Sequence, residues 1–160
     1  MHTLHRTQKL PLTVSQAWKF LSAPANLKVI TPAYMGFEMT SLHHGSEMYA
    51  GQIITYIVKP VLGIPLKWCT EITHVQEPDY FVDEQRFGPY TFWHHQHKLK
   101  EIQNGVLMED IVHYKLPLWF LGNIANSLFV ERQLADIFEF RQKKLIELFG
   151  EYNEDISIKN

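Results

Sequence analysis

The amino-acid sequence predicts an α+β fold in which a curved antiparallel sheet of six to seven strands wraps around one long C-terminal helix, with two short helices after the first strand. Two observations predict this fold. Between residues 37 and 116, segments of alternating apolar and polar side chains are separated by turn residues, as in an antiparallel meander. Between residues 123 and 149, apolar residues recur at spacings of three, four and seven, as in an amphipathic helix. A sheet beside a single long helix buries one face by curling around that helix.

The first 32 residues predict one strand and two short helices. Residues 5–12 form the expected strand. Thr13 is a good N-cap for a helix over residues 14–21, where apolar side chains share one stripe. Pro24 can begin a second short helix, and Pro32 ends it, because the residue before a proline is pushed out of helical geometry.

Three strands are expected next. The loop over residues 59–65, between the last two of them, is more apolar than a solvent-exposed loop needs to be. We expect this loop to form a cavity lid or an interaction edge, or else to fold over the core. The expected strands cover residues 37–43, 51–58 and 66–75, and the last of them carries Trp68, Thr70, Ile72 and His74 on one face.

The stretch from Phe81 to His97 carries the chemically unusual residues of the chain. It predicts two strands joined at Gly88-Pro89, and successive side chains of a strand point to opposite faces. Directly opposed residues of the two strands therefore share a face. One face then combines aromatic rings with an acid, an amide and two imidazoles, which is unusual for a plain core and suits the wall of a pocket. The expected pairs are Gln85 with Trp93, Asp83 with His95 and Phe81 with His97.

A second hairpin is predicted at Asn104-Gly105, the strongest short turn signal in the chain. With these two residues at the centre of the turn, Gln103 pairs with Val106. The apolar residues of the last strand then lie on the same face as the imidazoles, whereas a slip of one residue would move them to the opposite face. The further expected pairs are Leu99 with Asp110, His97 with Val112, His95 with Tyr114 and Trp93 with Leu116.

The predicted C-terminal helix over residues 123–149 is about 40 Å long, enough to cross a sheet from end to end. Arg141 falls inside its apolar stripe rather than on its polar face. Gly150 ends the helix, and residues 151–160 are expected to form a polar, mobile tail after a single domain over residues 1–150. The stripe consists of Val130, Leu134, Ile137, Phe138, Leu145 and Leu148.

Composition and charge exclude several classes of function. The chain has 160 residues and a formal net charge of −2, so it lacks the basic balance that nucleic acids or acidic membranes attract. No apolar run approaches the roughly 20 residues that span a bilayer, and the first residues do not resemble a signal peptide. The single Cys69 excludes internal disulfides, fits a reducing compartment and has no base to activate it. We therefore expect a cytoplasmic protein with no nucleic-acid partner and no stable membrane insertion.

Segments spread over most of the chain carry a family resemblance. They are Trp18, Phe20, Asn26-Leu27 and residues 30–32, 51–56, 63–65, 68–70, 81–85, 88–90, 93–97, 110, 114 and 137–141. With these segments, the sequence resembles the START/Bet v 1-like (SRPBCC, helix-grip) superfamily, and within it the bacterial ligand-binding and polyketide cyclase-like proteins. The resemblance implies a helix-grip domain with a cavity for a hydrophobic or amphipathic, lipid- or polyketide-like molecule between the sheet and the C-terminal helix. It implies no assigned catalytic residue.

Asp83, His95, His97 and Asp110 are the residues most suited to chemistry. Buried together in a cavity, their pKa values would shift, and His95 or His97 could act as a general acid/base with Asp83 fixing the tautomer. The alternative is a hydrogen-bonded ladder in which these groups satisfy one another and orient a ligand, since buried charges must be paired in either case. No Ser or Cys completes a nucleophile–base arrangement with them.

The same residues also suggest a metal site. Two imidazoles at positions i and i+2 with a carboxylate opposite, here His95, His97 and Asp83, suit iron or zinc. However, nothing else in the sequence has metal-site spacing, and His94 points away from the set. From the sequence we therefore expect neither a metal nor another cofactor.

Arg141 would either meet the carboxylate or phosphate of an amphipathic ligand or pair with Asp83 or Asp110 across the cavity. Aromatic side chains are expected both to line the cavity and to belong to the core. The expected ligand-binding residues are Tyr56, Trp68, Thr70, Asp83, Gln85, Trp93, His95, His97, Asp110, Tyr114, Phe138 and Arg141.

Three functions follow from these observations. The first is a cofactor-free protein that binds one hydrophobic or amphipathic small molecule, with apolar walls for affinity and the polar wall for orientation. The second is a cyclase or dehydratase type of enzyme that uses His95 or His97 with Asp83. The third is a protein-interaction domain whose interior is filled by its own Trp and Phe side chains. An open cavity would favour the first two functions, and a filled interior would favour the third.

Overall fold

The computed structural model describes residues 1–41, 45, 47–60, 63–117 and 124–154. It contains a seven-stranded antiparallel sheet in the order β1-β7-β6-β5-β4-β3-β2, so that only β1 is out of sequence order. The strands are β1 (His2–Leu10), β2 (Glu38–Met39), β3 (Gln52–Val58), β4 (Leu66–Gln76), β5 (Tyr80–Phe87), β6 (Phe92–Ile102) and β7 (Gly105–Lys115). The helices are α1 (Val14–Leu21), α2 (Ile124–Phe149) and the 3₁₀ segments η1 (Pro24–Lys28) and η2 (Ala33–Met35).

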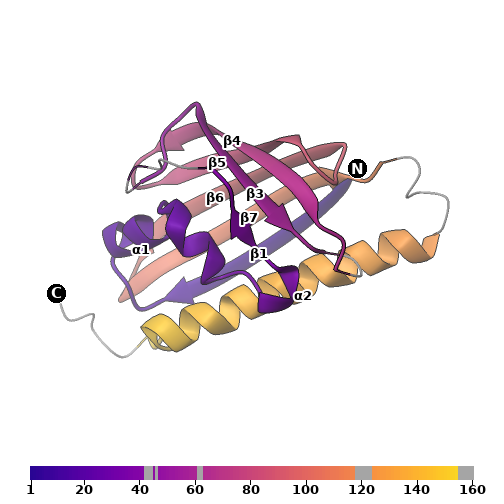
Figure 1. Cartoon of the computed structure of the whole chain (residues 1–160). Coiled ribbons are helices and arrows are strands. Elements are labelled where there is room, and N and C mark those ends of the chain that lie inside the picture. The colour runs from indigo at the N-terminus through magenta and orange to yellow at the C-terminus, as the bar shows by residue number, and fades with distance from the viewer. Residues whose placement is uncertain (42–44, 46, 61–62, 118–123, 155–160) are drawn as a thin grey trace.

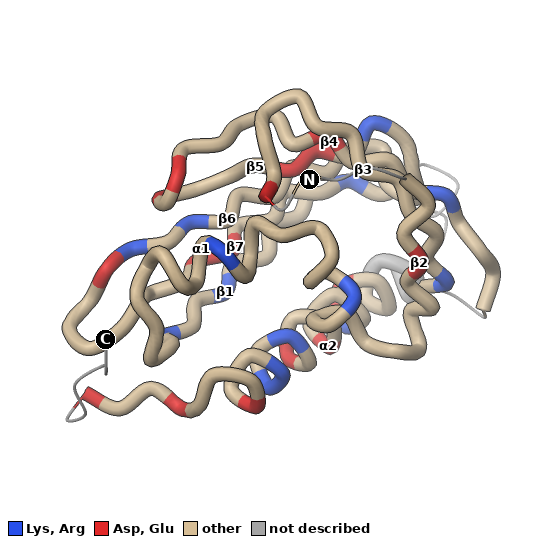
Figure 2. The backbone as a smooth tube through the Cα atoms, turned by 60° about the vertical axis from the view of Figure 1, so that its left-hand side comes forward, with Lys and Arg blue, Asp and Glu red and all other residues tan. Residues whose placement is uncertain are grey.

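The sheet curves over α2, as Figure 1 shows, and this arrangement confirms the expected α+β helix-grip fold. The segment that contains α1 and the 3₁₀ turns lies at one end of the sheet, between the first strand and β2. Figure 2 shows α2 lying across the open side of the sheet, with acidic and basic residues mixed along its length. Within the described part of the chain, none of the helices has the length and apolar character needed to cross a bilayer.

The first helix forms where its capping residue predicts. The Thr13 hydroxyl accepts from the backbone N–H of Gln16, and the Gln16 side chain accepts from the backbone N–H of Thr13, which completes a capping box. The predicted second helix is instead a short 3₁₀ turn, η1. A further 3₁₀ turn, η2, was not predicted; it begins after Pro32 and ends at Gly36, whose φ of 53° is in the left-handed region.

Two strand boundaries differ from the expectation for residues 5–12 and 37–43. β1 begins earlier, at His2, because it pairs with β7 over all nine of its residues. β2 is only two residues long, and residues 42–43 of the expected strand lie outside the described residues.

The expected face of β4 is correct up to Ile72 and wrong at His74. The pairing of β4 with β5 shifts between these two residues, as in a β-bulge. The extra residue reverses the alternation, so Val75 packs against the core and His74 is exposed. Assigning faces by the alternation of side chains along a strand fails beyond such a bulge.

The β6–β7 turn lies one residue earlier than predicted. Ile102 pairs with Gly105, so Gln103 and Asn104 are the central residues, and Asn104 has a left-handed φ of 56°. Gly105 is required instead for close packing, because a Cβ there would overlap the carbonyl oxygen of Leu10.

This change moves the predicted pairing by two residues, which leaves every side chain on its expected face. It makes His97, rather than Leu99, the direct partner of Asp110. The observed pairs are Leu99 with Met108, His97 with Asp110, His95 with Val112 and Trp93 with Tyr114.

The β5–β6 pairing is confirmed for Asp83 with His95 and for Phe81 with His97. The expected pair of Gln85 with Trp93 is wrong, because the ladder ends one residue earlier. The Gln85 side chain instead holds the turn: its amide donates to the Tyr90 carbonyl oxygen at 2.6 Å, and its Oε1 accepts from the Tyr90 backbone N–H at 3.2 Å.

Two apolar clusters lie between the sheet and the helices. One lies around α1 and the C-terminal end of α2, with Leu10, Trp18 and Leu145 at its centre. The other lies around Trp68, Trp93 and the middle of α2. The predicted stripe of α2 is buried or half-buried except for its last member, Leu148, which is exposed.

Residues 151–154 after α2 contact the body of the protein. The Tyr152 hydroxyl donates to the Gln103 carbonyl oxygen at 2.7 Å, and the Asn104 side-chain amide donates to the Glu154 carbonyl oxygen at 2.6 Å. This part of the expected polar tail is therefore bonded to the β6–β7 turn.

We predict that Gly105→Ala destabilises the protein, because its methyl group would overlap backbone that cannot rotate away. The expected loss in the free energy of unfolding is about 1–3 kcal/mol, the usual cost of forcing extra volume into packed structure. Gly45→Ala is the control, since its Cβ would meet only the Glu47 carbonyl oxygen at 3.7 Å. Urea unfolding of both variants measures the difference, and equal stabilities would contradict the prediction.

Candidate functional site

A cavity of about 590 Å³ lies between the concave face of the sheet and α2. A volume of this size is typical of small-molecule sites. The interior is therefore not filled by Trp and Phe side chains, contrary to the third function considered from the sequence. Of the expected ligand-binding residues, Tyr56, Trp68, Asp83, Trp93, His95, His97, Phe138 and Arg141 line the cavity.

Four expected ligand-binding residues do not line the cavity. Asp110 lies behind the two imidazoles, and Gln85 is occupied with the β5–β6 turn. The Thr70 hydroxyl is bonded to the Tyr56 hydroxyl at 3.0 Å. Tyr114 packs among aromatic rings, including His2 at 5.1 Å between ring centroids.

The cavity is also lined by residues that the sequence analysis missed. Most come from the 3₁₀ region, the β5–β6 turn and the segment after β7, where strand or helix periodicity does not apply, and Gln133 comes from α2. Apolar character could have indicated most of them, but not Thr31 or Gln133. They include Leu27, Ile30, Thr31, Met35, Phe37, Pro89, Tyr90, Leu116, Pro117 and Gln133.

The loop over residues 59–65 contributes to one side of the cavity. Pro60 lines it, and the Gln133 side chain of α2 donates to the Pro60 carbonyl oxygen. Ile64 is exposed, and Val61 and Leu62 lie outside the described residues. The described part of the loop is therefore connected to α2 beside the cavity.

The polar wall of the cavity is a ring of four residues, Asp83, His95, Asp110 and His97, in which each imidazole lies between both carboxylates. Hydrogen bonds join His95 Nε2 to Asp110 Oδ1 at 3.0 Å and His97 Nε2 to Asp83 Oδ2 at 2.7 Å. The other two contacts, His95 Nδ1 to Asp83 Oδ2 and His97 Nδ1 to Asp110 Oδ1, are ion-pair contacts of 3.2 Å. The imidazole centroids are 3.7 Å apart.

The strand order explains why the ring closes. β5, β6 and β7 are neighbours, so the central strand presents His95 and His97 between an acid on each side. Asp83 is directly opposite His95, and Asp110 is directly opposite His97. Because residues i and i+2 share a face, both imidazoles reach both carboxylates.

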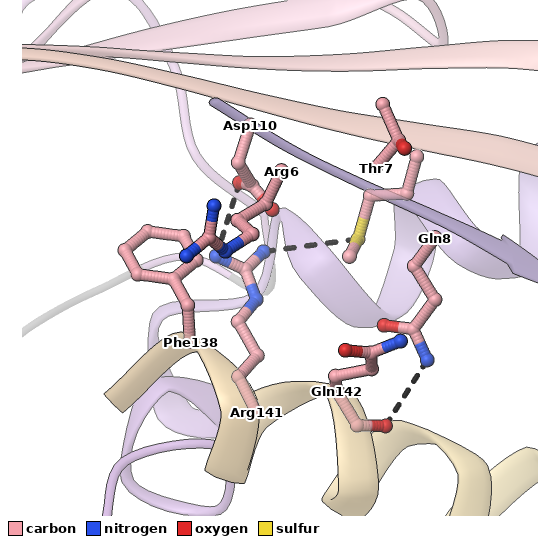
Figure 3. A pocket seen from close by; sticks show the side chains of 8 residues that line it. Arg6, Thr7, Gln8, Asp110, Phe138, Arg141 and Gln142 are labelled. Carbon is pink, nitrogen blue, oxygen red and sulfur yellow. Dashed lines mark hydrogen bonds and ion pairs between the residues drawn. The ribbon is translucent and has the colours of Figure 1, made fainter. Parts of the chain in front are cut away.

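Arg141 connects this ring to the helix. Figure 3 shows its guanidinium reaching from α2 to Asp110, with Nη1 donating to Asp110 Oδ1 at 3.1 Å. The sequence left open whether Arg141 pairs with Asp83 or with Asp110, and the structure selects Asp110. Beside this pair lies a small space of about 20 Å³, about the volume of one water molecule, next to Gln8 and Gln142.

Burial by itself would raise the pKa of both carboxyl groups, because it disfavours their charged forms. The charges and hydrogen bonds of the two imidazoles outweigh burial and hold the pKa of Asp83 well below its ordinary value. The Arg141 guanidinium, with the imidazoles, has the same effect on the pKa of Asp110. Burial would lower the pKa of His95, but the charge of Asp83 and the hydrogen bond to Asp110 raise it. Both acids are therefore carboxylates at neutral pH.

The remaining wall is mostly uncharged, with Lys67 as the exception, and combines aliphatic with aromatic side chains. Burial raises the pKa values of the Tyr56 and Tyr90 hydroxyls, which therefore remain uncharged. The Tyr56 ring stacks on Trp68 at 5.7 Å between ring centroids, and Trp68 meets Trp93 edge-on at 5.2 Å. The cavity thus combines one polar wall with extensive aromatic surface.

No protein-family model matches the sequence, and no curated protein matches it either. Solved structures match over most of the chain. Ms6760 from Mycobacterium smegmatis is 19% identical, with a TM-score of 0.64 over 91% of this chain and 89% of that chain. CV1439 from Chromobacterium violaceum is 12% identical, with a TM-score of 0.70 over 95% and 100%. Ara h 8.0201 is 13% identical, with a TM-score of 0.62 over 91% and 98%.

We predict that Asp110→Asn destabilises the protein by about 3–5 kcal/mol, the usual cost of removing one partner from a buried ion pair. The change leaves the Arg141 charge buried without its carboxylate. Glu109→Gln is the matched control, because the neighbouring carboxylate lies on the outer face and contacts His5 near solvent. Chemical denaturation measures both. A loss below 1 kcal/mol for Asp110→Asn would show that the pair is unimportant for stability.

The pKa shifts predict a limited pH range in which the ring stabilises the fold. The lowered pKa values of Asp83 and Asp110 give a contribution that is present above their unfolded pKa of about 4 and is lost as pH falls. The raised pKa of His95 gives a contribution that is present below its unfolded pKa of about 6.5 and is lost as pH rises through the folded value.

Unfolding free energies measured against pH, with EDTA present, should therefore show the largest contribution between about pH 4 and about pH 6.5. The decline above this range should be absent from His95→Gln. The same alkaline decline in both proteins would contradict the assignment to His95.

Proposed function

We propose that this chain, which has the START/Bet v 1-like helix-grip fold of the structures above, binds one hydrophobic or amphipathic small molecule inside the cavity. The observation that carries the proposal is an open cavity of about 590 Å³ with a wall that is mostly apolar and aromatic. Burial of apolar surface would supply most of the affinity, about 25 cal/mol for each Å² removed from water. The single Cys69 fits a reducing compartment and so supports a cytoplasmic location for this activity.

The polar wall would orient the ligand. Asp83, His95, His97 and Arg141 share the cavity wall with Leu27, Ile30 and other apolar residues. A ligand with one polar end and a lipid-like or polyketide-like body would match both surfaces. A polar group placed against the apolar wall would lose its hydrogen bonds to water without replacement, so the ligand would bind in one direction.

A cofactor-independent cyclase or dehydratase is the second candidate function. The observation that favours it is that imidazoles and a carboxylate, His95, His97 and Asp83, converge on an open cavity. An imidazole between two carboxylates can accept a proton from a bound molecule and return it at another atom. A ligand that the wild-type protein changes chemically, and that His97→Gln binds unchanged, would favour the enzyme over the carrier.

We predict that Ile137→Trp weakens binding of the fluorescent probe 1-anilinonaphthalene-8-sulfonate by about tenfold, or 1.4 kcal/mol. Ile137 is a half-buried residue of α2 that lines the cavity, so a larger side chain there occupies space needed by the probe. Ile53→Trp is the control, because Ile53 is exposed on β3 and does not line the cavity. Fluorescence titration gives both affinities.

Mass spectrometry of the native protein from several expression hosts then identifies what the cavity holds. A co-purifying apolar molecule that Ile137→Trp excludes and Ile53→Trp retains is the expected result. Equal probe binding by the two variants, together with no molecule lost from Ile137→Trp, would contradict binding in the cavity.

A further inference from the structure

We propose that Asp83, His95 and His97 bind a divalent transition-metal ion of the zinc type at the polar wall of the cavity. This inference goes beyond the binding of a small molecule and does not depend on it. It reverses the expectation from the sequence, where the two imidazoles and the acid were the only indication of a metal site. The tertiary structure adds four further indications: the distances between the ligand atoms, the outer hydrogen-bond partners of the ligands, the charge of the site, and its access from the cavity.

The three side chains already have the spacing of metal ligands. Asp83 Oδ2 lies 3.2 Å from His95 Nδ1 and 2.7 Å from His97 Nε2, and the three ligand atoms lie within 4.8 Å of one another. Two bonds of about 2.1 Å at a tetrahedral angle separate their ligand atoms by about 3.4 Å. Small side-chain movements therefore place all three atoms around one ion. Among the described residues, no other group of this kind is found.

Both imidazoles have an outer carboxylate partner. Asp110 Oδ1 lies 3.0 Å from His95 Nε2 and 3.2 Å from His97 Nδ1, on the side of each ring opposite Asp83. Histidines that bind metals usually donate their other N–H to such a carboxylate, which fixes the tautomer and orients the ring. Arg141 holds Asp110 in this position.

The acid is oriented in the same way. Trp93 Nε1 donates to Asp83 Oδ1 at 3.1 Å, which leaves Oδ2 as the oxygen that faces both imidazoles. Every proposed ligand thus has one atom held by the protein and another directed to a common point. This division of roles separates a metal site from a simple cluster of charges.

His97 provides an independent indication. It is 6% exposed, yet its Nδ1 has no hydrogen bond of acceptable geometry, although Asp110 is 3.2 Å away. With a metal on Nε2, the hydrogen stands on Nδ1, and a small rotation of the ring would bring it into line with Asp110 Oδ1 at 3.2 Å. Metal binding would therefore satisfy a buried nitrogen that is otherwise without a hydrogen-bond partner.

Charge and access also suit a cation. Metal ions bind imidazoles in their neutral form, and with both imidazoles in that form the two carboxylates and Arg141 carry a net charge of −1, which a divalent ion can balance. Asp83, His95 and His97 line the cavity, so the positions not filled by the protein would face its interior. Three protein ligands with an open position are typical of catalytic rather than structural zinc sites, and two imidazoles with one carboxylate also suit Fe²⁺ and Co²⁺.

Titration of the full chain with Co²⁺, after dialysis against EDTA and then metal-free buffer, tests the proposal. We expect one equivalent to bind with a visible d–d absorption that Zn²⁺ removes. Asp110→Asn, which loses an outer partner of the histidines, should weaken Co²⁺ binding by about 10–100-fold. His97→Gln loses a ligand itself and should weaken Co²⁺ binding by at least as much. His94→Gln is the matched control, because His94 lies on the same strand but is bonded to Glu84 on the outer face.

A measurement on the wild-type protein keeps the test independent of how the variants fold. One equivalent of Zn²⁺ should shift the imidazole nitrogen resonances of His95 and His97 and leave those of His94 and His113 unchanged. Absence of saturable one-to-one Co²⁺ binding would overturn the proposal. Zn²⁺-induced shifts confined to the outer histidines, or equal Co²⁺ affinity in His97→Gln and His94→Gln, would overturn it as well. None of these results affects binding of the apolar probe, so the two proposals fail separately.

Discussion

Asp110 contacts three cationic or titratable side chains at once, and the arrangement of sheet and helix depends on these contacts. It is 1% exposed and lies on β7, within 3.2 Å of both imidazoles of β6 and of the Arg141 guanidinium of α2. Apolar packing alone would allow the stripe of α2 to slide or rotate over the sheet, because such packing is non-directional. A buried carboxylate and guanidinium must meet in one geometry, since either charge left unpaired would cost several kcal/mol. The pair therefore determines where α2 crosses the sheet.

The ring around Asp110 also divides the interior. On β7, Met108 belongs to the apolar cluster near α1, whereas Val112 belongs to the cluster around Trp93. Asp110 lies between them, and the imidazoles lie between the corresponding residues of β6. Most apolar residues that line the cavity belong to the cluster around Trp93, and Leu27 and Ile30 reach it from the cluster near α1. The residues of the ring therefore have two roles. Asp110 holds the helix to the sheet through Arg141, whereas Asp83, His95 and His97 present polar groups to the cavity.

Strand alternation predicted the inward direction of the imidazoles and of Asp83 correctly, because the period of two is strict wherever one face of a strand is buried. The same count failed at His74, where a β-bulge interrupts the alternation, and the ladder ends before the expected pair of Gln85 with Trp93. The turn at residues 103–104 lies one residue before the predicted one, because Gly105 serves close packing against Leu10 rather than the turn. The resulting error of two residues preserved the faces and changed the partner of His97.

The order of residues along the chain was enough to predict the fold class, the burial of both imidazoles, and the position of Arg141 on the apolar side of the last helix. These features depend on local periodicity, which a single chain displays directly. Three features are visible only in the folded chain: Arg141 pairs with Asp110, the interior remains open, and each imidazole has a carboxylate on both sides. These features depend on how three strands and a helix meet, and contacts between distant segments follow from packing and register rather than from spacing along the chain.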